Sequence, residues 1–171
     1  RIAPIAVRGM GDAEYDNEGR LQVIEFPEFT LLNGYWPNSQ DERKRLDYKL
    51  NYVKGVTKLA NKLRKAGKQV VLCGDFNIAH TEIDLARPKE NENSPGYYLE
   101  EREAMTHFLK QGYVDTFRHF NKAPGQYTWW SYRTRGRERN VGWRLDYHCV
   151  NAEFMPRVKR AWILSDVMGS D

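Results

Sequence analysis

The sequence predicts an α/β domain in which helices cover a mixed β-sheet. Segments with strand-like and helix-like patterns alternate over residues 20–111, and further strand-like runs follow. This alternation is typical of sheets covered by helices. At 171 residues the chain is long enough to bury a substantial core as one domain. We therefore expect a single domain over residues 1–171, with too few strands near its amino terminus to complete the fold.

The first two predicted strands form a hairpin. Residues 20–26 alternate between apolar and polar side chains, and residues 29–35 form an apolar run. A short turn between them joins the two strands. Pro37 ends the second strand, because proline has no backbone N–H to donate to a sheet. Tyr35 and Asn38 are therefore expected at the end of this strand.

The clearest helical pattern comes next. Ser39 and Glu42 have the spacing of a capping box, which predicts the start of a helix, and Gly67 predicts its end. Lys and Arg fill the opposite face, which favours a solvated surface over contact with nucleic acid. The apolar positions with helical spacing are Leu46, Leu50, Val53, Val56 or Thr57, Ala60 and Leu63.

A buried strand and a second helix follow. Residues 69–73 form a short apolar run, which Gly74-Asp75-Phe76-Asn77 follows directly. Residues 79–99 are polar and contain Pro, Asn and Gly, which predicts a long surface loop of the kind that is usually functional or disordered. The second helix is predicted at 100–111. Residues 113–120 show a mixed pattern, and two more strands are predicted at 144–150 and 157–164.

The charge distribution permits a partner that carries phosphate. The net charge of +4 allows an anionic partner without requiring one. Between positions 133 and 144, five arginines stand against a single acid, Glu138, and such a cluster suits phosphate groups. The five are Arg133, Arg135, Arg137, Arg139 and Arg144.

The cysteines and the hydropathy of the sequence predict where the protein is located. Cys73 and Cys149 lie in apolar runs, so we expect reduced thiols in an intracellular protein, in the cytoplasm, nucleoid or nucleus. The sequence has no run of about 20 apolar residues, so we expect no membrane partner.

Polar side chains recur where the predicted strands end. A carboxylate beside a buried strand costs free energy unless it is paired or bound to a metal, so several of them suggest one shared site. Simpler alternatives remain for each residue. Asp75 could form a turn, and Asn38 could cap the helix. Asp146 could pair with Arg144 or Arg135. The residues concerned are Tyr35, Asn38, Asp75, Asn77, Asp146 and Asp171.

Three longer motifs resemble one known family. They are Cys73-Gly74-Asp75-Phe76-Asn77, Asn140-Val141-Gly142-Trp143-Arg144-Leu145-Asp146-Tyr147 and Gly169-Ser170-Asp171. With supporting matches along essentially the whole chain, the sequence is similar to the exonuclease III family of abasic-site (AP) endonucleases, within the endonuclease/exonuclease/phosphatase superfamily. The resemblance implies a DNase I-like fold, here a partial four-layer α/β sandwich of two packed mixed sheets flanked by helices.

The resemblance also implies that the chain is a fragment. In the family the catalytic histidine follows the Ser-Asp pair that stands here at 170–171, and a metal-binding glutamate comes from strands that would precede Arg1. None of His80, His107, His119 and His148 matches the missing histidine by motif, and His148 is interpreted as a strand residue. We therefore expect a domain truncated at both ends and inactive by itself.

The family's catalytic roles transfer to four residues. Asp75 is expected to orient or deprotonate water, and Asn77 to hold Asp75 or a phosphate oxygen. Tyr35 would donate its hydroxyl to the phosphate or the leaving group. Asp146 would orient the missing histidine, as carboxylates orient imidazoles in other hydrolases.

The metal and substrate contacts are likewise implied by the resemblance. Asp171 would bind Mg²⁺ or Mn²⁺, with Asp75 and Asn77 as further candidate ligands. Trp129, Trp130 and Trp143 would line a pocket for an abasic sugar, unless two of the three are core residues. The other expected substrate contacts are Asn38, Asn91, Ser94, Arg133, Arg135, Arg137 and Asn140.

The function implied is that of a DNA repair nuclease. It would hydrolyse the phosphodiester 5′ to an abasic site in double-stranded DNA, with 3′–5′ exonuclease and 3′ phosphodiesterase activities as further expectations, and would act as a monomer. One alternative is a phosphatase or nonspecific nuclease of the same superfamily, which would not require the Trp-rich segment around Trp143. The other alternative is a noncatalytic DNA-binding fragment.

Overall fold

A computed structural model describes residues 3–167, and its centre is a six-stranded mixed sheet. One neighbouring pair, 30–35 with 70–75, is parallel, and the other pairs in this sheet are antiparallel. The predicted α/β class with a mixed sheet is confirmed. In spatial order the strands are β1 (Ala6–Arg8), β2 (Leu21–Glu25), β3 (Thr30–Tyr35), β4 (Val70–Asp75), β8 (Asp146–Asn151) and β5 (Tyr113–Asp115).

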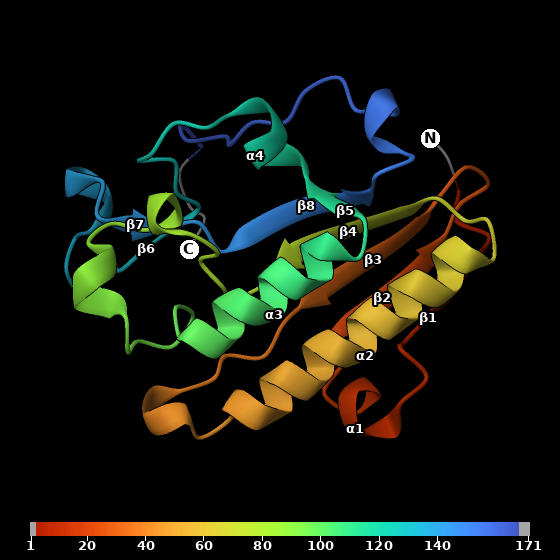
Figure 1. Cartoon of the computed structure of the whole chain (residues 1–171), viewed down its shortest axis with the longest axis horizontal. Helices are drawn as coiled ribbons and strands as arrows, with labels where there is room; N and C mark the ends of the chain where they lie inside the picture. The colour runs from red at the N-terminus through yellow and green to blue at the C-terminus, as the bar shows by residue number, and fades with distance from the viewer. Residues whose placement is uncertain (1–2, 168–171) are drawn as a thin grey trace.

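Two long helices, α2 (Leu46–Lys65) and α3 (Leu99–Lys110), lie side by side over one face of this sheet (Figure 1). None of the helices in the described part of the chain is long and apolar enough to cross a membrane. A second sheet within residues 3–167 has only two strands, β6 (Trp129–Trp130) and β7 (Gly142–Trp143). The remaining helices are α1 (Ala13–Asp16) and α4 (Thr116–Phe120), with 3₁₀ turns at Asp41–Arg43, Glu82–Asp84, Pro88–Asn91, Arg137–Arg139 and Met155–Arg157.

The first long helix begins later than the capping box predicted. It starts at Leu46, and the Ser39 side chain is buried with no hydrogen-bond partner among the described residues. Gln40, Glu42 and Arg43 have φ near +60°, which a right-handed helix does not allow. The predicted end is confirmed, since Gly67 has φ +78° two residues after Lys65.

Two further expectations were wrong. Residues 157–164 form no strand, because they lie across the sheet face opposite α2 and α3 and pair with no strand edge within residues 3–167. Residues 79–99 are more than a surface loop, because Asp84, Leu85 and Tyr97 are buried in them. Neither β1 nor α1 was predicted.

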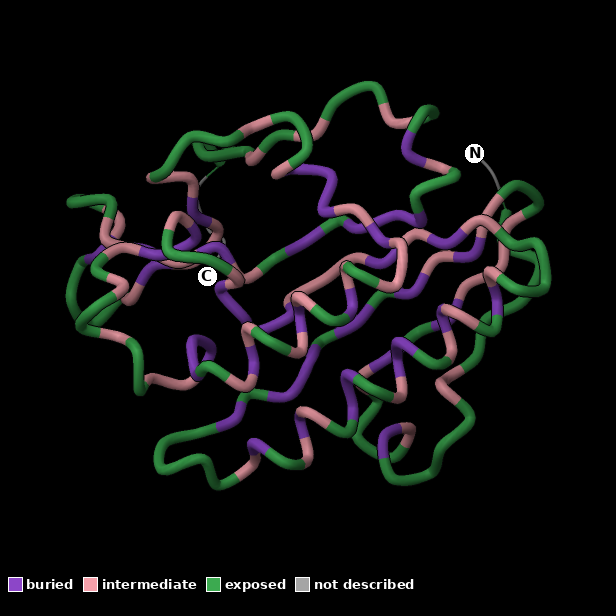
Figure 2. Tube along the Cα trace, in the orientation of Figure 1, coloured by how far each residue is buried: buried purple, intermediate pink, exposed green. Residues whose placement is uncertain are grey.

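Packed aromatic rings fix the ends of the two parallel strands. Trp36, which follows β3, stacks on Phe76, which follows β4, with ring centroids 3.9 Å apart. Phe76 stacks in turn on Tyr147 of β8 at 5.0 Å. All three side chains belong to the buried core between the sheet and the helices, which appears as purple segments in Figure 2. The expected free thiols are also present, at Cys73 and Cys149.

Candidate active site

Three of the predicted catalytic residues form a row across three adjacent strands. Tyr35 at the end of β3 is the register partner of Asp75 at the end of β4, and Asp75 is the partner of Asp146. Directly paired residues share one face of a sheet, so the three side chains are neighbours. Asp146 begins β8 instead of ending it, and it reaches this edge because β8 runs antiparallel to β4.

The glycine before Asp75 permits the close approach of β3 and β4. Gly74 has φ +123°, and a Cβ at this position would lie 2.0 Å from the carbonyl oxygen of Gly34. Any side chain here would force the strands apart. The glycine at position 74 therefore allows Asp75 to lie beside Tyr35.

Asp75, Asn77 and Asn38 form a hydrogen-bonded cradle. The Asp75 carboxylate accepts from the backbone N–H of Asn77 at 2.7 Å and from its side-chain amide at 3.2 Å. The same Asn77 amide donates to the Trp36 carbonyl at 3.0 Å, and its oxygen accepts from the Asn38 amide at 3.3 Å. Asn77 adopts φ +51°, so its backbone bends to bring both of its donors to Asp75. Asp75 thus makes the turn that was one alternative, and Asn77 holds Asp75.

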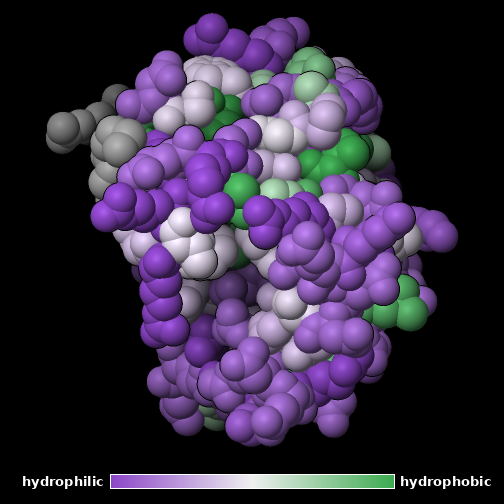
Figure 3. All heavy atoms as spheres, turned by 90° about the vertical axis from the view of Figure 1, so that its left-hand side faces the viewer, coloured by the Kyte–Doolittle hydropathy of each residue, from purple (hydrophilic) through white to green (hydrophobic). Residues whose placement is uncertain are grey.

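A cavity of about 590 Å³ opens over this cradle. The end of the molecule that carries β6 and β7 is largely hydrophilic and visibly hollowed (Figure 3). The cavity brings together eight of the residues predicted from the sequence to act in catalysis or substrate binding. They are Tyr35, Asn38, Asp75, Asn77, Asn91, Ser94, Trp129 and Trp143.

The cavity also contains charged residues that the sequence analysis missed. Arg87 is the one cation in its described lining, and its guanidinium lies 3.5 Å from the Glu90 carboxylate. Arg87 has φ +56°, and its carbonyl accepts from the Asn91 amide at 2.9 Å. The signal in the sequence was weak, since a single arginine in a polar loop resembles any solvated side chain.

Buried charges hold the loop that carries Arg87. Asp84 bonds Arg144 at 2.8 Å and Arg118 at 2.7 Å, and Arg144 also bonds Asp115 at 2.7 Å. Burial alone would raise the pKa of Asp84, but the two guanidinium groups outweigh it and lower that pKa. The alternative that Asp146 pairs with Arg144 is therefore wrong. The Arg144 side chain instead bonds Asp84 and Asp115, and the backbone N–H of Asp146 donates to the Thr128 hydroxyl at 3.1 Å.

His80 follows Asn77 of the cradle by three residues, and its backbone N–H donates to the Tyr147 hydroxyl at 3.2 Å. His80 contacts the Thr106 hydroxyl through Nε2 at 2.8 Å. Burial lowers the pKa of His80, and the charges of Asp84 and Asp115 oppose this effect. His148 is an exposed residue of β8, as expected.

Some predicted contacts lie elsewhere. Trp130 is nearly buried and donates to the Asn140 side chain at 3.1 Å, and Asn140 in turn donates to the Gly125 carbonyl. Arg137 covers the Trp130 ring at 4.8 Å and donates to the carbonyls of Ser165 and Val167. These contacts give Trp130, Asn140 and Arg137 structural partners, and their proposed contacts with substrate stay predictions.

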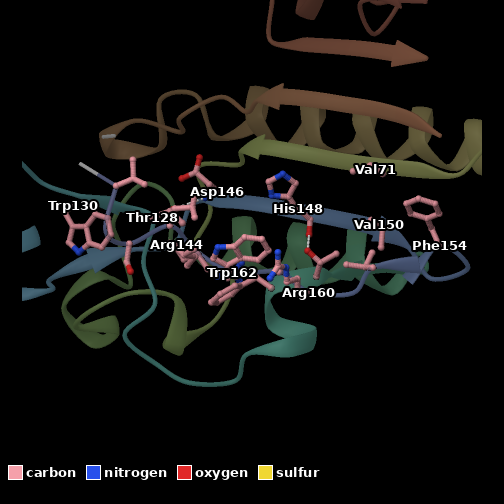
Figure 4. Close-up of a pocket in the computed structure, with 18 of the residues that line it drawn as sticks. Val71, Thr128, Trp130, Arg144, Asp146, His148, Val150, Phe154, Arg160 and Trp162 are labelled. Carbon is pink, nitrogen blue, oxygen red and sulfur yellow. Dashed lines mark hydrogen bonds between the residues drawn. The ribbon is translucent and has the colours of Figure 1, made fainter. Parts of the chain in front are cut away.

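A second cavity, of about 680 Å³, lies between β8 and residues 158–167 (Figure 4). Asp146, His148, Trp130 and Trp162 are among its lining residues. The row of Tyr35, Asp75 and Asp146 therefore borders both cavities. Arg133 and Arg135 are exposed outside them, and Asp171 lies outside the described residues.

The donor set for a metal ion is incomplete in the described residues. Asp75 and Glu90 are the carboxylates in the described lining of the first cavity, and Glu90 is paired with Arg87. No group of three or more His, Cys, Asp or Glu side chains within residues 3–167 is arranged to hold a metal. The oxygens of Asp75 and Asn77 suit a hard divalent cation but supply only part of its coordination.

Comparisons with known proteins agree with this geometry. The model of the Endonuclease/Exonuclease/phosphatase family matches residues 4–171. An exodeoxyribonuclease of Bacillus subtilis is 43% identical over 96% of the chain, which spans 66% of that protein. A DNA-(apurinic or apyrimidinic site) endonuclease of Dictyostelium discoideum is 44% identical over 95% of the chain, which spans 46% of that protein. The crystal structure of AP endonuclease LMAP from Leishmania major superposes with a TM-score of 0.86 at 27% identity, over 96% of this chain and 57% of that one.

Proposed function

The chain belongs to the endonuclease/exonuclease/phosphatase family, and from this premise we propose that the whole protein is a DNA repair nuclease that cuts 5′ to abasic sites in duplex DNA. One observation carries the proposal: a single cavity combines the row of Tyr35 and Asp75 with the aromatic rings of Trp129 and Trp143. The names of its relatives support it, since they include an exodeoxyribonuclease and an apurinic/apyrimidinic endonuclease.

Asp75 is the proposed group that orients and deprotonates the attacking water. Hydrolysis of a phosphodiester needs a carboxylate or other base that faces the phosphorus in line with the leaving oxygen. Asn77 donates twice to the Asp75 carboxylate and so fixes its orientation. Asp146, its neighbour across β4 and β8, is the proposed partner of an imidazole supplied from outside the described residues.

Tyr35, Asn38 and Arg87 are the proposed donors to the phosphate. Negative charge grows on the phosphoryl and leaving oxygens during the reaction, and donors fixed in advance stabilise it. The Tyr35 ring is exposed at the cavity, where its hydroxyl is available to a phosphate. The Asn38 amide uses one hydrogen on Asn77, and the second remains for a phosphate oxygen. Arg87 supplies the positive charge that a dianionic transition state requires.

The proposed cofactor is a divalent cation, Mg²⁺ or Mn²⁺. Asp75 and Asn77 would contribute oxygen ligands to it, with Asp171 as a further proposed ligand beyond the described residues. When bound, the ion would stabilise charge on the phosphoryl oxygens.

Trp129 and Trp143 form the proposed aromatic wall of a pocket for the extruded abasic sugar. An abasic nucleotide leaves the helical stack at low cost because it has no base to unstack. Trp129 and Trp143 are directly paired on β6 and β7, so their neighbouring rings form one aromatic wall of the cavity of about 590 Å³, against which a sugar without a base would pack. The proposal extends to a monomeric protein, and to an intracellular one because both cysteines are free thiols.

An incision assay with the full-length protein tests the proposal. The substrate is a duplex with one tetrahydrofuran abasic analogue, assayed with Mg²⁺, with EDTA, and beside an intact duplex. We expect magnesium-dependent cutting 5′ to the analogue, abolished by Asp75→Asn. Absence of cutting with DNA still bound would contradict the enzyme and favour a binding protein, whereas equal cutting of both duplexes would favour a nonspecific nuclease.

A further inference from the structure

Lys49 is a fully buried cation on the sheet-facing side of α2. It occupies a helical position that otherwise carries apolar residues, between Leu46 and Tyr52. Burial of an ammonium group costs several kcal/mol unless its hydrogens are bonded and its charge is paired. A lysine at such a position therefore needs a structural or functional reason.

The partners of Lys49 connect two helices to the active-site cradle. Its Nζ donates to the Glu101 carboxylate at 2.7 Å and to the backbone carbonyl of Asn77 at 2.6 Å. Glu101 is also fully buried, and its second oxygen accepts from the Tyr98 N–H at the start of α3. The ion pair thus joins α2 and α3, which lie side by side in Figure 1, and adds a bond to the loop after β4.

The bond to Asn77 acts on the conformation that positions Asp75. Asn77 has φ +51°, a value that is uncommon for residues other than glycine and that Asn adopts more readily than most. In this conformation the Asn77 N–H and side-chain amide donate to Asp75. The Asn77 carbonyl points into the protein, where it accepts a hydrogen bond from the Lys49 ammonium group. A buried carbonyl without a donor would favour a different backbone conformation.

The ammonium group of Lys49 does not enter the cavity, since it is absent from the cavity lining and fully buried.

We infer that Lys49 is a positioning residue for the proposed phosphodiester hydrolysis: by holding the Asn77 carbonyl, it fixes the Asp75–Asn77 cradle. This inference rests on the proposed function. It does not make Lys49 a catalytic residue, because the side chain touches neither the cavity nor the substrate.

Three variants of the full-length protein separate positioning from stability. Lys49→Met keeps the volume of the side chain but leaves Glu101 buried without a cation, so it lowers both stability and activity. Lys49→Met combined with Glu101→Gln removes both charges and keeps an acceptor for the Tyr98 N–H. Lys49→Arg retains a donor for the Asn77 carbonyl. Arg64→Met, which alters an exposed ion pair on the same helix, is the control.

The readouts are the melting temperature and the steady-state kinetics on the abasic duplex. We expect the double variant to recover the melting temperature but to keep kcat reduced by about a hundredfold, the scale of a small misplacement of catalytic groups, with KM nearly unchanged. Lys49→Arg should restore most of kcat, and Arg64→Met should leave it unchanged. Recovery of kcat together with the melting temperature in the double variant would overturn the inference. A wild-type protein that cuts nothing would instead overturn the proposed function.

Discussion

Asp75 and Asp146 lie directly opposite each other on the antiparallel strands β4 and β8. Like charges at directly paired positions destabilise a sheet. Two adjacent carboxylates at one sheet edge are therefore costly to the fold, and their juxtaposition is consistent with a role in chemistry.

Asp146→Asn should separate stability from activity. Removal of one charge of the pair should raise the free energy of unfolding by about 0.2–1 kcal/mol. Incision should fall by about 10²–10⁴-fold, since Asp146 is the proposed partner of the catalytic imidazole. Urea unfolding and incision assays on the same preparation measure both effects. A variant that is less stable, or fully active, would contradict this assignment.

The stability of the fold should decrease as the pH falls from 7.5 to 5.5. Burial lowers the pKa of His80 below its ordinary value of 6.5. Below that pH His80 binds a proton in the unfolded chain but stays neutral in the folded chain, so acid stabilises the unfolded state. His80→Gln, which keeps a hydrogen-bonding group for Thr106, should flatten the profile in this window.

Urea unfolding at each pH measures this effect. The effect of Asp84 on stability falls in a lower pH range than that of His80, because Arg144 and Arg118 lower the pKa of Asp84 against the effect of burial. Its contribution is lost only as the pH falls below about 4. An unchanged slope between pH 7.5 and 5.5 in His80→Gln would show that another group carries the acid sensitivity.

Arg144→Met should destabilise the fold strongly. The substitution leaves Asp84 with one cation and Asp115 with none, and an uncompensated buried charge costs about 3–5 kcal/mol. Arg64→Met is the matched control, because its partner Glu153 is half exposed and surface pairs contribute about 1 kcal/mol or less. Similar losses in both variants would show that the buried network contributes no more than a surface pair.

The sequence predicted the local elements of the site well. Tyr35 and Asp75 were placed at strand ends because alternation, apolar runs and Pro37 are signals within a few residues. The strands now seen as β3 and β4, the long helices and the end at Gly67 were predicted for the same reason, although the parallel pairing of the two strands was not. The motif resemblance then assigned roles that local patterns alone could not.

The errors concern interactions between distant parts of the chain. The Lys49–Glu101 pair joins residues 52 positions apart, so the sequence near Lys49 does not indicate its partner. The spacing of Ser39 and Glu42 predicted a helix start, but Gln40, Glu42 and Arg43 adopt positive φ, and the helix begins only at Leu46. Residues 157–164 have the composition of a strand, and composition does not reveal whether a strand edge is available to pair with.

Substitutions at Arg87 and Glu90 should change DNA affinity in opposite directions. Arg87→Gln removes the cation in the described lining of the cavity, so affinity should fall and the slope of log K against log salt should decrease by about one. Glu90→Gln frees Arg87 from its partner and removes a negative charge, so affinity should rise. Fluorescence anisotropy with an abasic duplex over a salt series measures both. If Glu90→Gln weakens binding, Glu90 itself contributes a contact.

The neighbours Trp129 and Trp130 should respond differently to the same substitution. Trp129 lines the cavity, so Trp129→Ala should raise KM for the abasic duplex and cost about 1–3 kcal/mol of binding, the scale of one stacked ring. Trp130 is nearly buried beneath Arg137 and bonds Asn140, so Trp130→Ala should cost about 3–5 kcal/mol of stability. Melting curves and kinetics for both variants make the comparison. Should Trp130→Ala remain stable and raise KM more than Trp129→Ala, the abasic sugar would enter from the side of the second cavity.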